Sequence, residues 1–155
     1  MSDPTTEDFT EMINQARDAW SHAMGLQFVR VTREEVVGEL EVWPVHLQAY
    51  GVVHGGVHAG VLETLASVGA AVNAMARGQT VVGLENHTSF VRAVRGGRLR
   101  ATVVPLTRGR RSQLWEGRIV DDANHLIATG RVRLLCLEPG AELAGTPAAL
   151  QTREG

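Results

Sequence analysis

A continuous apolar segment, residues 57–76, constrains the fold of this chain more than any other feature. It consists almost entirely of Val, Leu, Ala, Gly, Ser and Thr, and Glu63 is its one charged residue. A helix that is apolar nearly all round is a buried helix, and at about 1.5 Å per residue this one is long enough to cross a small domain. We therefore expect one long central helix, ended by Arg77 and Gly78.

The segments on either side of this helix show the patterns of β-strands. Residues 26–31 and 36–43 predict a hairpin through residues 32–35. Four strands are expected after the helix, separated by turns that contain Gly, Asn or Asp: residues 81–94, 98–107, 112–121 and 125–137. Short turns between consecutive strands predict an antiparallel meander. The fold class is therefore α+β, with an antiparallel sheet wrapped around the central helix.

The two ends of the chain differ in composition. Residues 6–24 carry apolar residues at helical spacing and are followed by Gly25, which predicts an N-terminal amphipathic helix. From Glu138 onward the chain is rich in Pro, Gly, Ala and Thr without periodicity. We expect a single domain over residues 1–138, which includes the N-terminal helix within residues 1–25, and a flexible tail over residues 139–155.

Composition excludes several classes of protein. With 155 residues, 44% hydrophobic and 21% charged, the chain has the make-up of one ordinary globular domain. A net charge of −2 gives no reason to expect a nucleic acid or a membrane as partner. The single cysteine, Cys136, excludes an intrachain disulfide and is interpreted as a core residue. Neither a signal peptide nor a membrane span is apparent, so a cytoplasmic protein is expected.

Glu63 is the strongest local anomaly. Burial of an unpaired carboxylate is costly, and no basic residue lies three or four positions away from Glu63. Ser67 shares its helix face and could hold a water beside it. A desolvated carboxylate next to a positioned water is the make-up of a general base or a nucleophile. Two other interpretations stay open: an exposed stripe of the helix, or a pairing with an arginine of a strand.

A glycine-rich segment, residues 51–56, precedes the helix. Glycines there leave backbone N–H groups accessible, and the helix dipole favours negative charge, which suits an oxygen that becomes an oxyanion. A plain tight turn is the alternative. His54 and His58 are four residues apart, but the HExxH order is missing, so no metal site is expected.

Residues 108–112, Arg-Gly-Arg-Arg-Ser, form a basic cluster. Such a cluster is either a solvated turn or a phosphate site, because guanidinium groups match phosphate oxygens. Nucleic acid is the weaker interpretation, since no aromatic residues alternate with the arginines.

Three motifs together resemble the hotdog-fold acyl-CoA thioesterases, in the PaaI-like branch that includes the Arthrobacter-type 4-hydroxybenzoyl-CoA thioesterase. The motifs are residues 48–56, Glu63 with Ser67, and residues 85–90, and the likeness covers residues 26–137. It implies hydrolysis of an acyl- or aroyl-CoA thioester to the free acid and CoA. No cofactor is implied, because coenzyme A is part of the substrate.

The resemblance also implies roles for individual residues. Glu63 would be the catalytic carboxylate, as nucleophile or as base on water, and the Gly55 amide would polarise the thioester carbonyl. Ser67, where the family often has Thr, would position water. Gln48 and His54 would orient the thioester and assist the leaving group or water. The acyl or pantetheine region would be lined by Asn86, His87 and Ser89. Arg110 and Arg111 would bind the CoA phosphates, at positions where related enzymes use Ser or Thr.

Gly55 and Glu63 are too far apart to act on one carbonyl from the same chain. They are separated by eight residues, about 12 Å along a helix, whereas a reacting carbonyl lies about 3 Å from both its donor and its attacker. If both act, they come from two subunits with antiparallel central helices. We expect at least a dimer, and a homotetramer as a dimer of dimers.

Two other functions stay open. A hotdog hydratase or dehydratase would need a His–acid pair suited to proton abstraction at an acyl carbon. A non-catalytic acyl-CoA binding or sensing module would bind without turnover. The aromatic content of 5% is compatible with a pocket for either an aromatic or an aliphatic acyl group, so the sequence does not specify the acyl group.

Overall fold

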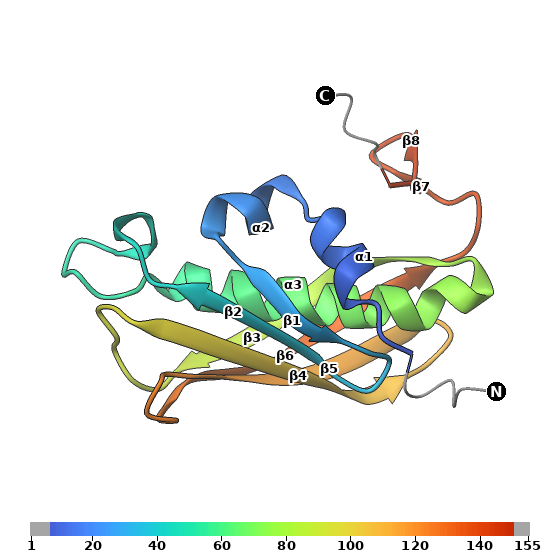
Figure 1. The fold of residues 1–155 in the computed structure, drawn as a ribbon. Coiled ribbons are helices and arrows are strands. Elements are labelled where there is room, and N and C mark those ends of the chain that lie inside the picture. The colour runs from blue at the N-terminus through green and yellow to red at the C-terminus, as the bar shows by residue number, and fades with distance from the viewer. Residues whose placement is uncertain (1–6, 151–155) are drawn as a thin grey trace.

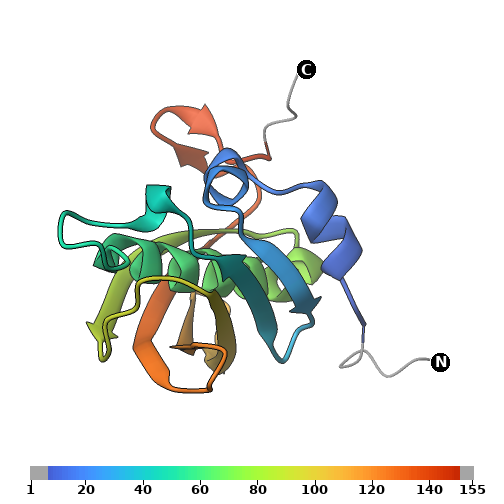
Figure 2. The same cartoon turned by 60° about the vertical axis from the view of Figure 1, so that its left-hand side comes forward.

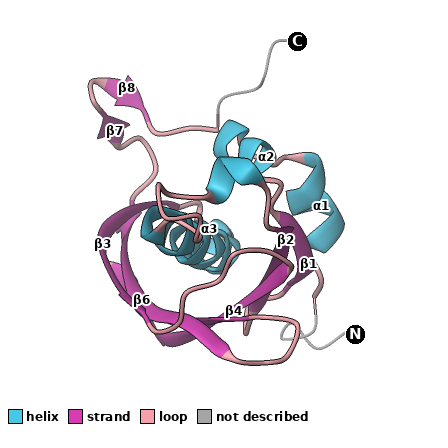
Figure 3. Ribbon diagram, turned by 90° about the vertical axis from the view of Figure 1, so that its left-hand side faces the viewer, coloured by secondary structure: helices cyan, strands magenta, loops and turns pink. Residues whose placement is uncertain are grey.

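The computed structural model describes residues 7–150. An antiparallel sheet of six strands curls around one long helix, α3, and two short helices lie outside it (Figures 1 and 3). The elements are α1 (Thr10–Gln15), α2 (Ala19–Met24), β1 (Gln27–Val31), β2 (Val36–Glu41), a 3-10 turn (Pro44–His46), α3 (Gly55–Ala74), a second 3-10 turn (Met75–Arg77), β3 (Thr80–Phe90), β4 (Arg98–Arg108), β5 (Ser112–Val120), β6 (Leu126–Leu137), β7 (Glu142–Leu143) and β8 (Thr146–Pro147). This confirms the predicted hotdog fold.

The strand order is β1-β2-β4-β5-β6-β3, with every pair antiparallel. The β1–β2 hairpin and the β4–β5–β6 meander are as predicted. The prediction that β3 and β4 are neighbours was wrong: β3 pairs with β6 at one edge of the sheet, whereas β4 pairs with β2. Residues 91–97 are therefore a crossing connection. They are longer than most hairpin loops. Their Gly-Gly pair has the composition of a hairpin turn, but the two flanking strands do not pair with each other.

The N-terminal segment forms two helices where one was predicted. α1 ends at Gln15, and Asp18 starts α2 by accepting a hydrogen bond from the Ser21 amide at 2.7 Å. A carboxylate that binds a nearby backbone amide begins a new helix at that point. Gly25 ends α2 in a left-handed conformation, as predicted.

α3 is the core of the molecule. Figure 3 looks along this helix and shows the sheet curving around it. Although the sequence analysis identified no membrane span, the helix Gly55–Arg77 is long and apolar enough to cross a membrane, and an 18-residue window within it has a mean hydropathy of 1.3. The helix instead packs on five strands of the sheet. The side chains that fill the space between include Leu62, Leu65, Val103 and Trp115.

The predicted C-terminal tail is partly structured. β7 and β8 form a small hairpin over residues 142–147, which stands apart from the main sheet (Figure 2). Residues 151–155 of the tail lie outside the described residues, and its flexibility stays a prediction. Cys136 is a buried, free thiol on β6, as predicted.

Candidate active site

Glu63 lies on the face of α3 that packs against the edge strand β3. Its half-buried carboxylate accepts a hydrogen bond from the Asn86 side-chain amide at 3.0 Å. The same Asn86 group donates to the Ala59 carbonyl at 2.9 Å, and its oxygen accepts from the Thr88 hydroxyl at 2.6 Å. Within residues 7–150 no cation pairs with Glu63, so the interpretation as an arginine pair is wrong.

A β-bulge on β3 forms the other wall around this carboxylate. The pairing with β6 shifts between Gly83 and Glu85, which leaves Leu84 as the extra residue. Because of this shift Gly83 and Asn86 both approach the Glu63 carboxylate, although three positions separate them. A Cβ atom at position 83 would overlap Oε1 of Glu63. The carboxylate thus has a backbone wall on one side and an amide donor on the other.

The Glu63 side chain opens onto a groove of ≈ 370 Å³. This groove is called the carboxylate groove below. Its lining is formed by α3 and β3: Ala59, Gly60, Glu63, Asn86, Thr88 and Phe90. Ser67 lies one turn along the same helix and is half-buried. Its role in positioning a water beside the carboxylate stays a prediction.

The start of α3 presents several hydrogen-bond donors. His54 is the N-cap, and its Nδ1 accepts from the Gly56 amide at 2.8 Å. The proton of neutral His54 therefore sits on Nε2, which is free to donate. Gln48 Oε1 accepts from the Tyr50 amide, so its NH₂ group is also free. The Gly55 amide has no partner within the described part of the chain.

Gln48 and Gly55 line a second groove, of ≈ 250 Å³, which is called the amide groove below. Its lining comes from the loops around the start of α3 and the end of β3: Gln48, Val52, Val53, Gly55, His58, Phe90, Val91, Arg92 and Ala93. Phe90 lines both grooves, and its ring lies so close to Gly55 that a Cβ there would come within 2.6 Å of it. In one chain the Gly55 amide and the Glu63 carboxylate thus occupy separate hollows.

His58 is a buried member of the amide groove. Its side chain is 4% exposed, its ring centroid lies 6.1 Å from that of Phe90, and its Nδ1 has no partner among the described residues. Burial lowers the pKa of His58 from its ordinary 6.5 to about 4, so the ring is neutral near pH 7. His54 lies outside α3 and is exposed. The two histidines do not converge, and no three metal-binding side chains cluster in residues 7–150.

The remaining predicted site residues lie elsewhere in this chain. His87 and Ser89 alternate with Asn86 and Thr88 along β3, so their side chains leave the opposite face of the strand. Arg110 is exposed and pairs with Glu138 at 3.3 Å. Its carbonyl accepts from Gln79, which places it and Arg111 near the far end of α3 from Gly55. Roles for these residues stay predictions.

Sequence reasoning missed four residues of this region: His58 as a groove residue, Gly83, Thr88 and Phe90. Thr88 and Phe90 share the strand face of Asn86, so strict alternation through the predicted strand would have found them. Gly83 depends on the bulge, and the burial of His58 depends on the packing of the sheet. Neither has a local signal.

Known proteins resemble this chain in sequence and in fold. Residues 50–128 match the family model of the thioesterase superfamily. The chain is 44% identical over 117 residues to a Mycobacterium tuberculosis protein named as an esterase, Rv1847, across 74% of this chain and 84% of that one. The solved structure of Rv1847 superposes with a TM-score of 0.77 over 78% of this chain and 98% of the other, at 41% identity.

Two further relatives carry more specific names. A 1,4-dihydroxy-2-naphthoyl-CoA hydrolase of Listeria monocytogenes is 32% identical over 108 residues, 70% of this chain and 87% of its own. The solved thioesterase HI1161 of Haemophilus influenzae superposes with a TM-score of 0.79 over 86% of this chain and 94% of the other, at 27% identity.

An antiparallel sheet wrapped around one central helix is the hotdog fold. The chain belongs to the thioesterase superfamily and is a thioester hydrolase. The narrower PaaI-like, Arthrobacter-type branch stays a prediction.

Proposed function

We propose that this enzyme hydrolyses an acyl- or aroyl-CoA thioester with Glu63 as the reacting carboxylate. The observation that carries this proposal is a half-buried carboxylate without a counter-ion, held by Asn86 and open to a groove. Glu63 either attacks the thioester carbon or takes a proton from the water that attacks it. In both routes the C–S bond breaks and CoA leaves as the thiolate; when Glu63 attacks, the acyl–Glu63 anhydride is then hydrolysed by water to the free acid and the carboxylate.

The donors at the start of α3 would bind the thioester oxygen. The Gly55 amide lies at a helix N-terminus, where the dipole stabilises negative charge. Gln48 lines the same groove as Gly55, and His54 directly precedes Gly55 in the chain. Their side-chain N–H groups would orient the thioester. Ser67 would position the water. The name of the Listeria relative, which acts on a CoA thioester, supports CoA as the leaving group.

We place each complete site between two subunits. Phe90 separates Gly55 from Glu63 within one chain, so the carbonyl held by Gly55 would meet the partner subunit's Glu63. The assembly would be a dimer at least, and a tetramer as a dimer of dimers. A cytoplasmic location is part of the same proposal.

The hydratase alternative lacks its required pair in residues 7–150. The carboxylate of Glu63 is held by an amide, and the one histidine in contact with a carboxylate is His125, beside Asp121 at an exposed turn. Within one described chain, neither groove therefore contains the His–acid pair that proton abstraction at an acyl carbon requires. Release of the CoA thiol distinguishes hydrolysis from hydration.

Replacement of Glu63 tests the proposal. We expect Glu63→Gln to lower kcat by about 10³-fold or more, because the amide neither attacks nor accepts a proton. Benzoyl-CoA and a medium-chain acyl-CoA serve as substrates, and a thiol reagent follows CoA release. Glu41→Gln, at the exposed last residue of β2, is the matched control and should keep wild-type kcat. Retained activity in a folded Glu63→Gln protein contradicts the assignment.

Mixed dimers test the shared site. Gln48→Ala and Glu63→Ala proteins would each be inactive alone. If the two residues act across the interface, a random mixture regains up to about a quarter of wild-type activity, because half of the dimers carry one intact site of two. If each site belongs to one chain, no mixture regains activity. The mixture thus tests whether the site is shared between subunits, whereas the single Glu63 variant tests whether Glu63 is catalytic.

A further inference from the structure

His46 is a buried polar side chain that the proposed reaction leaves unused. It ends the short 3-10 turn that follows β2 and is 1% exposed. The lining of the carboxylate groove and that of the amide groove do not include it. Buried polar groups are normally paired by hydrogen bonds, and both nitrogens of this ring have a partner.

The two partners of the His46 ring decide which nitrogen carries the proton. Nδ1 accepts from the Trp43 amide at 2.8 Å, and Nε2 lies 2.9 Å from the Met24 carbonyl oxygen. A backbone amide can only donate and a carbonyl oxygen can only accept, so the proton sits on Nε2. Met24 is the last residue of α2, where carbonyl groups lack partners within the helix. The ring thus ties the turn to the C-terminal end of α2.

Residues 46–54 form a loop that is closed by its own backbone and is called the donor loop below. The His46 carbonyl accepts from the His54 amide at 2.8 Å. Inside this pair, the Gln48 amide donates to the Val52 carbonyl at 2.9 Å. These bonds fix Gln48 and His54 relative to each other, and α3 begins directly after the loop. A displacement of the donor loop would therefore move both side chains together.

The donor loop is bonded to distant parts of the fold at few points. The Val53 amide and the Tyr50 carbonyl bond to residues 94–95, in the connection between β3 and β4, at 2.8 and 2.7 Å. Toward α2, the described chain offers one such bond, from the His46 ring to Met24. Without it, residues 94–95 alone would hold the loop from outside. A shift of about 1 Å at groups that orient a substrate costs about 100-fold in rate.

We propose that His46 is a positioning residue whose bond to Met24 holds the donor loop where Gln48 and His54 face the bound thioester. This inference rests on the proposed thioesterase site and adds the end of α2 to the parts of the fold on which turnover depends. The ring acts through the loop and does not touch the substrate. Because the loop side chains would orient the reacting thioester, their displacement lowers kcat and leaves KM nearly unchanged.

Two amide substitutions separate the two bonds of the ring. Asn has its oxygen where the ring has Nδ1, so His46→Asn keeps an acceptor for the Trp43 amide but is too short for Met24. In His46→Gln the longer side chain reaches Met24 with its NH₂ group and leaves the Trp43 amide unpaired. With benzoyl-CoA and hexanoyl-CoA as substrates, we expect His46→Gln to keep kcat within about fivefold. His46→Asn should lower kcat about 30-fold or more, with KM within about threefold of the wild-type value.

Hydrogen exchange shows whether the loop has moved. The Gln48 and His54 amides are bonded inside the donor loop, so their exchange rates report on its order. We expect both amides to exchange faster in His46→Asn than in His46→Gln or the wild type.

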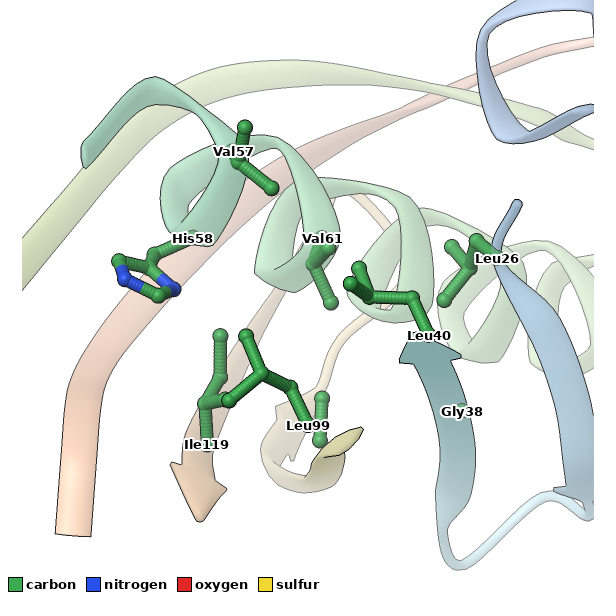
Figure 4. Close-up of a pocket in the computed structure, with 9 residues that line it drawn as sticks. Leu26, Gly38, Leu40, Val57, His58, Val61, Leu99 and Ile119 are labelled. Atoms are coloured by element: carbon green, nitrogen blue, oxygen red, sulfur yellow. The ribbon is translucent and has the colours of Figure 1, made fainter. Parts of the chain in front are cut away.

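Leu99→Ala is the control for packing. Figure 4 shows Leu99 beside Ile119 in the packed space between α3 and the sheet, and Leu99 lines neither the carboxylate groove nor the amide groove. The cavity left by this change should lower the melting temperature. It should leave kcat and the exchange of the donor loop unchanged.

Three outcomes overturn the inference: wild-type kcat in a folded His46→Asn protein, equal losses of kcat in His46→Asn and His46→Gln, or the same loss in Leu99→Ala. If His46→Asn does not fold, His46→Thr, which is also too short for Met24, takes its place. Glu63→Gln, assayed beside these variants, shows independently whether the proposed reaction holds.

Discussion

At Gly83 the backbone of β3 passes directly against the Glu63 carboxylate. A single methyl group at this position would overlap Oε1 and push the carboxylate away from Asn86. We expect Gly83→Ala to fold and to lower kcat/KM about 100-fold, because a shift of about 1 Å at a reacting group costs that much. Gly96→Ala is the control, since a Cβ there meets nothing within 4 Å. Wild-type kcat/KM in Gly83→Ala would contradict this account of the site.

The pKa of His58 predicts a pH-dependent stability. Its folded value of about 4 lies below its ordinary 6.5, so between these values the unfolded chain binds the extra proton. The contribution of His58 to the free energy of unfolding is therefore fully present above about pH 6.5. It is lost as the pH falls toward 4, and the loss amounts to up to about 3 kcal/mol. Urea unfolding of wild type and His58→Phe between these pH values measures the difference. Parallel pH profiles for the two proteins would show that the buried ring does not titrate as stated.

The predictability of the site follows from how local its signals are. Glu63 stood out because one charge interrupts an apolar helix, and Gly55 because glycines precede that helix. The Asn86 contact and the approach of Gly83 arise from a bulge in a strand paired with β6. A bulge shifts which residues share a face, and its position is set by the partner strand. These parts required the structure.

At the scale of elements, α3 and β5 meet at Gly69. A Cβ at this position would lie 2.6 Å from the fully buried Trp115 ring. Helix propensity alone favours Ala over Gly by about 1 kcal/mol, but overpacking a core costs about 1–3 kcal/mol. We expect packing to dominate, so that Gly69→Ala lowers the free energy of unfolding. In a Trp115→Leu background the same change should become neutral or stabilising, and unfolding curves of all four proteins measure this cycle. A stabilising Gly69→Ala in the native background would show that the helix and sheet are loosely packed there.

Most elements were predictable because their patterns are local. α3, the β1–β2 hairpin and β4 to β6 lie within a few residues of their predicted bounds. Two features were not: the break between α1 and α2 at Asp18, and the position of β3 at the sheet edge. The first results from one side-chain hydrogen bond, and the second from a pairing between strands distant in sequence. The spacing of apolar residues, from which the elements were predicted, is the same with or without either feature, so it could not reveal them.

For the whole molecule, the edge strand β3 and the divided site point to the same assembly. β3 has 11 residues, pairs with β6 on one side only, and exposes Leu84 and Phe90. A long edge strand with exposed apolar residues is a template for pairing with another chain. Asn86 lies on this strand and Glu63 contacts it, so a second copy seated there would cover the carboxylate groove and bring its own Gly55 toward it.

Leu84→Lys tests whether the β3 edge carries the assembly. Leu84 is the bulge residue and is 56% exposed, so the change should leave the fold of the monomer intact. Lysine on an edge strand discourages pairing, and we expect the protein to shift from dimer or tetramer toward monomer in analytical ultracentrifugation. kcat/KM should fall with the dimer fraction and recover at higher protein concentration, because only the assembly joins Gly55 to the partner's Glu63. Leu143→Lys, on the separate β7–β8 hairpin, should change neither property. A Leu84→Lys protein that is monomeric and fully active would show that one chain carries a complete site.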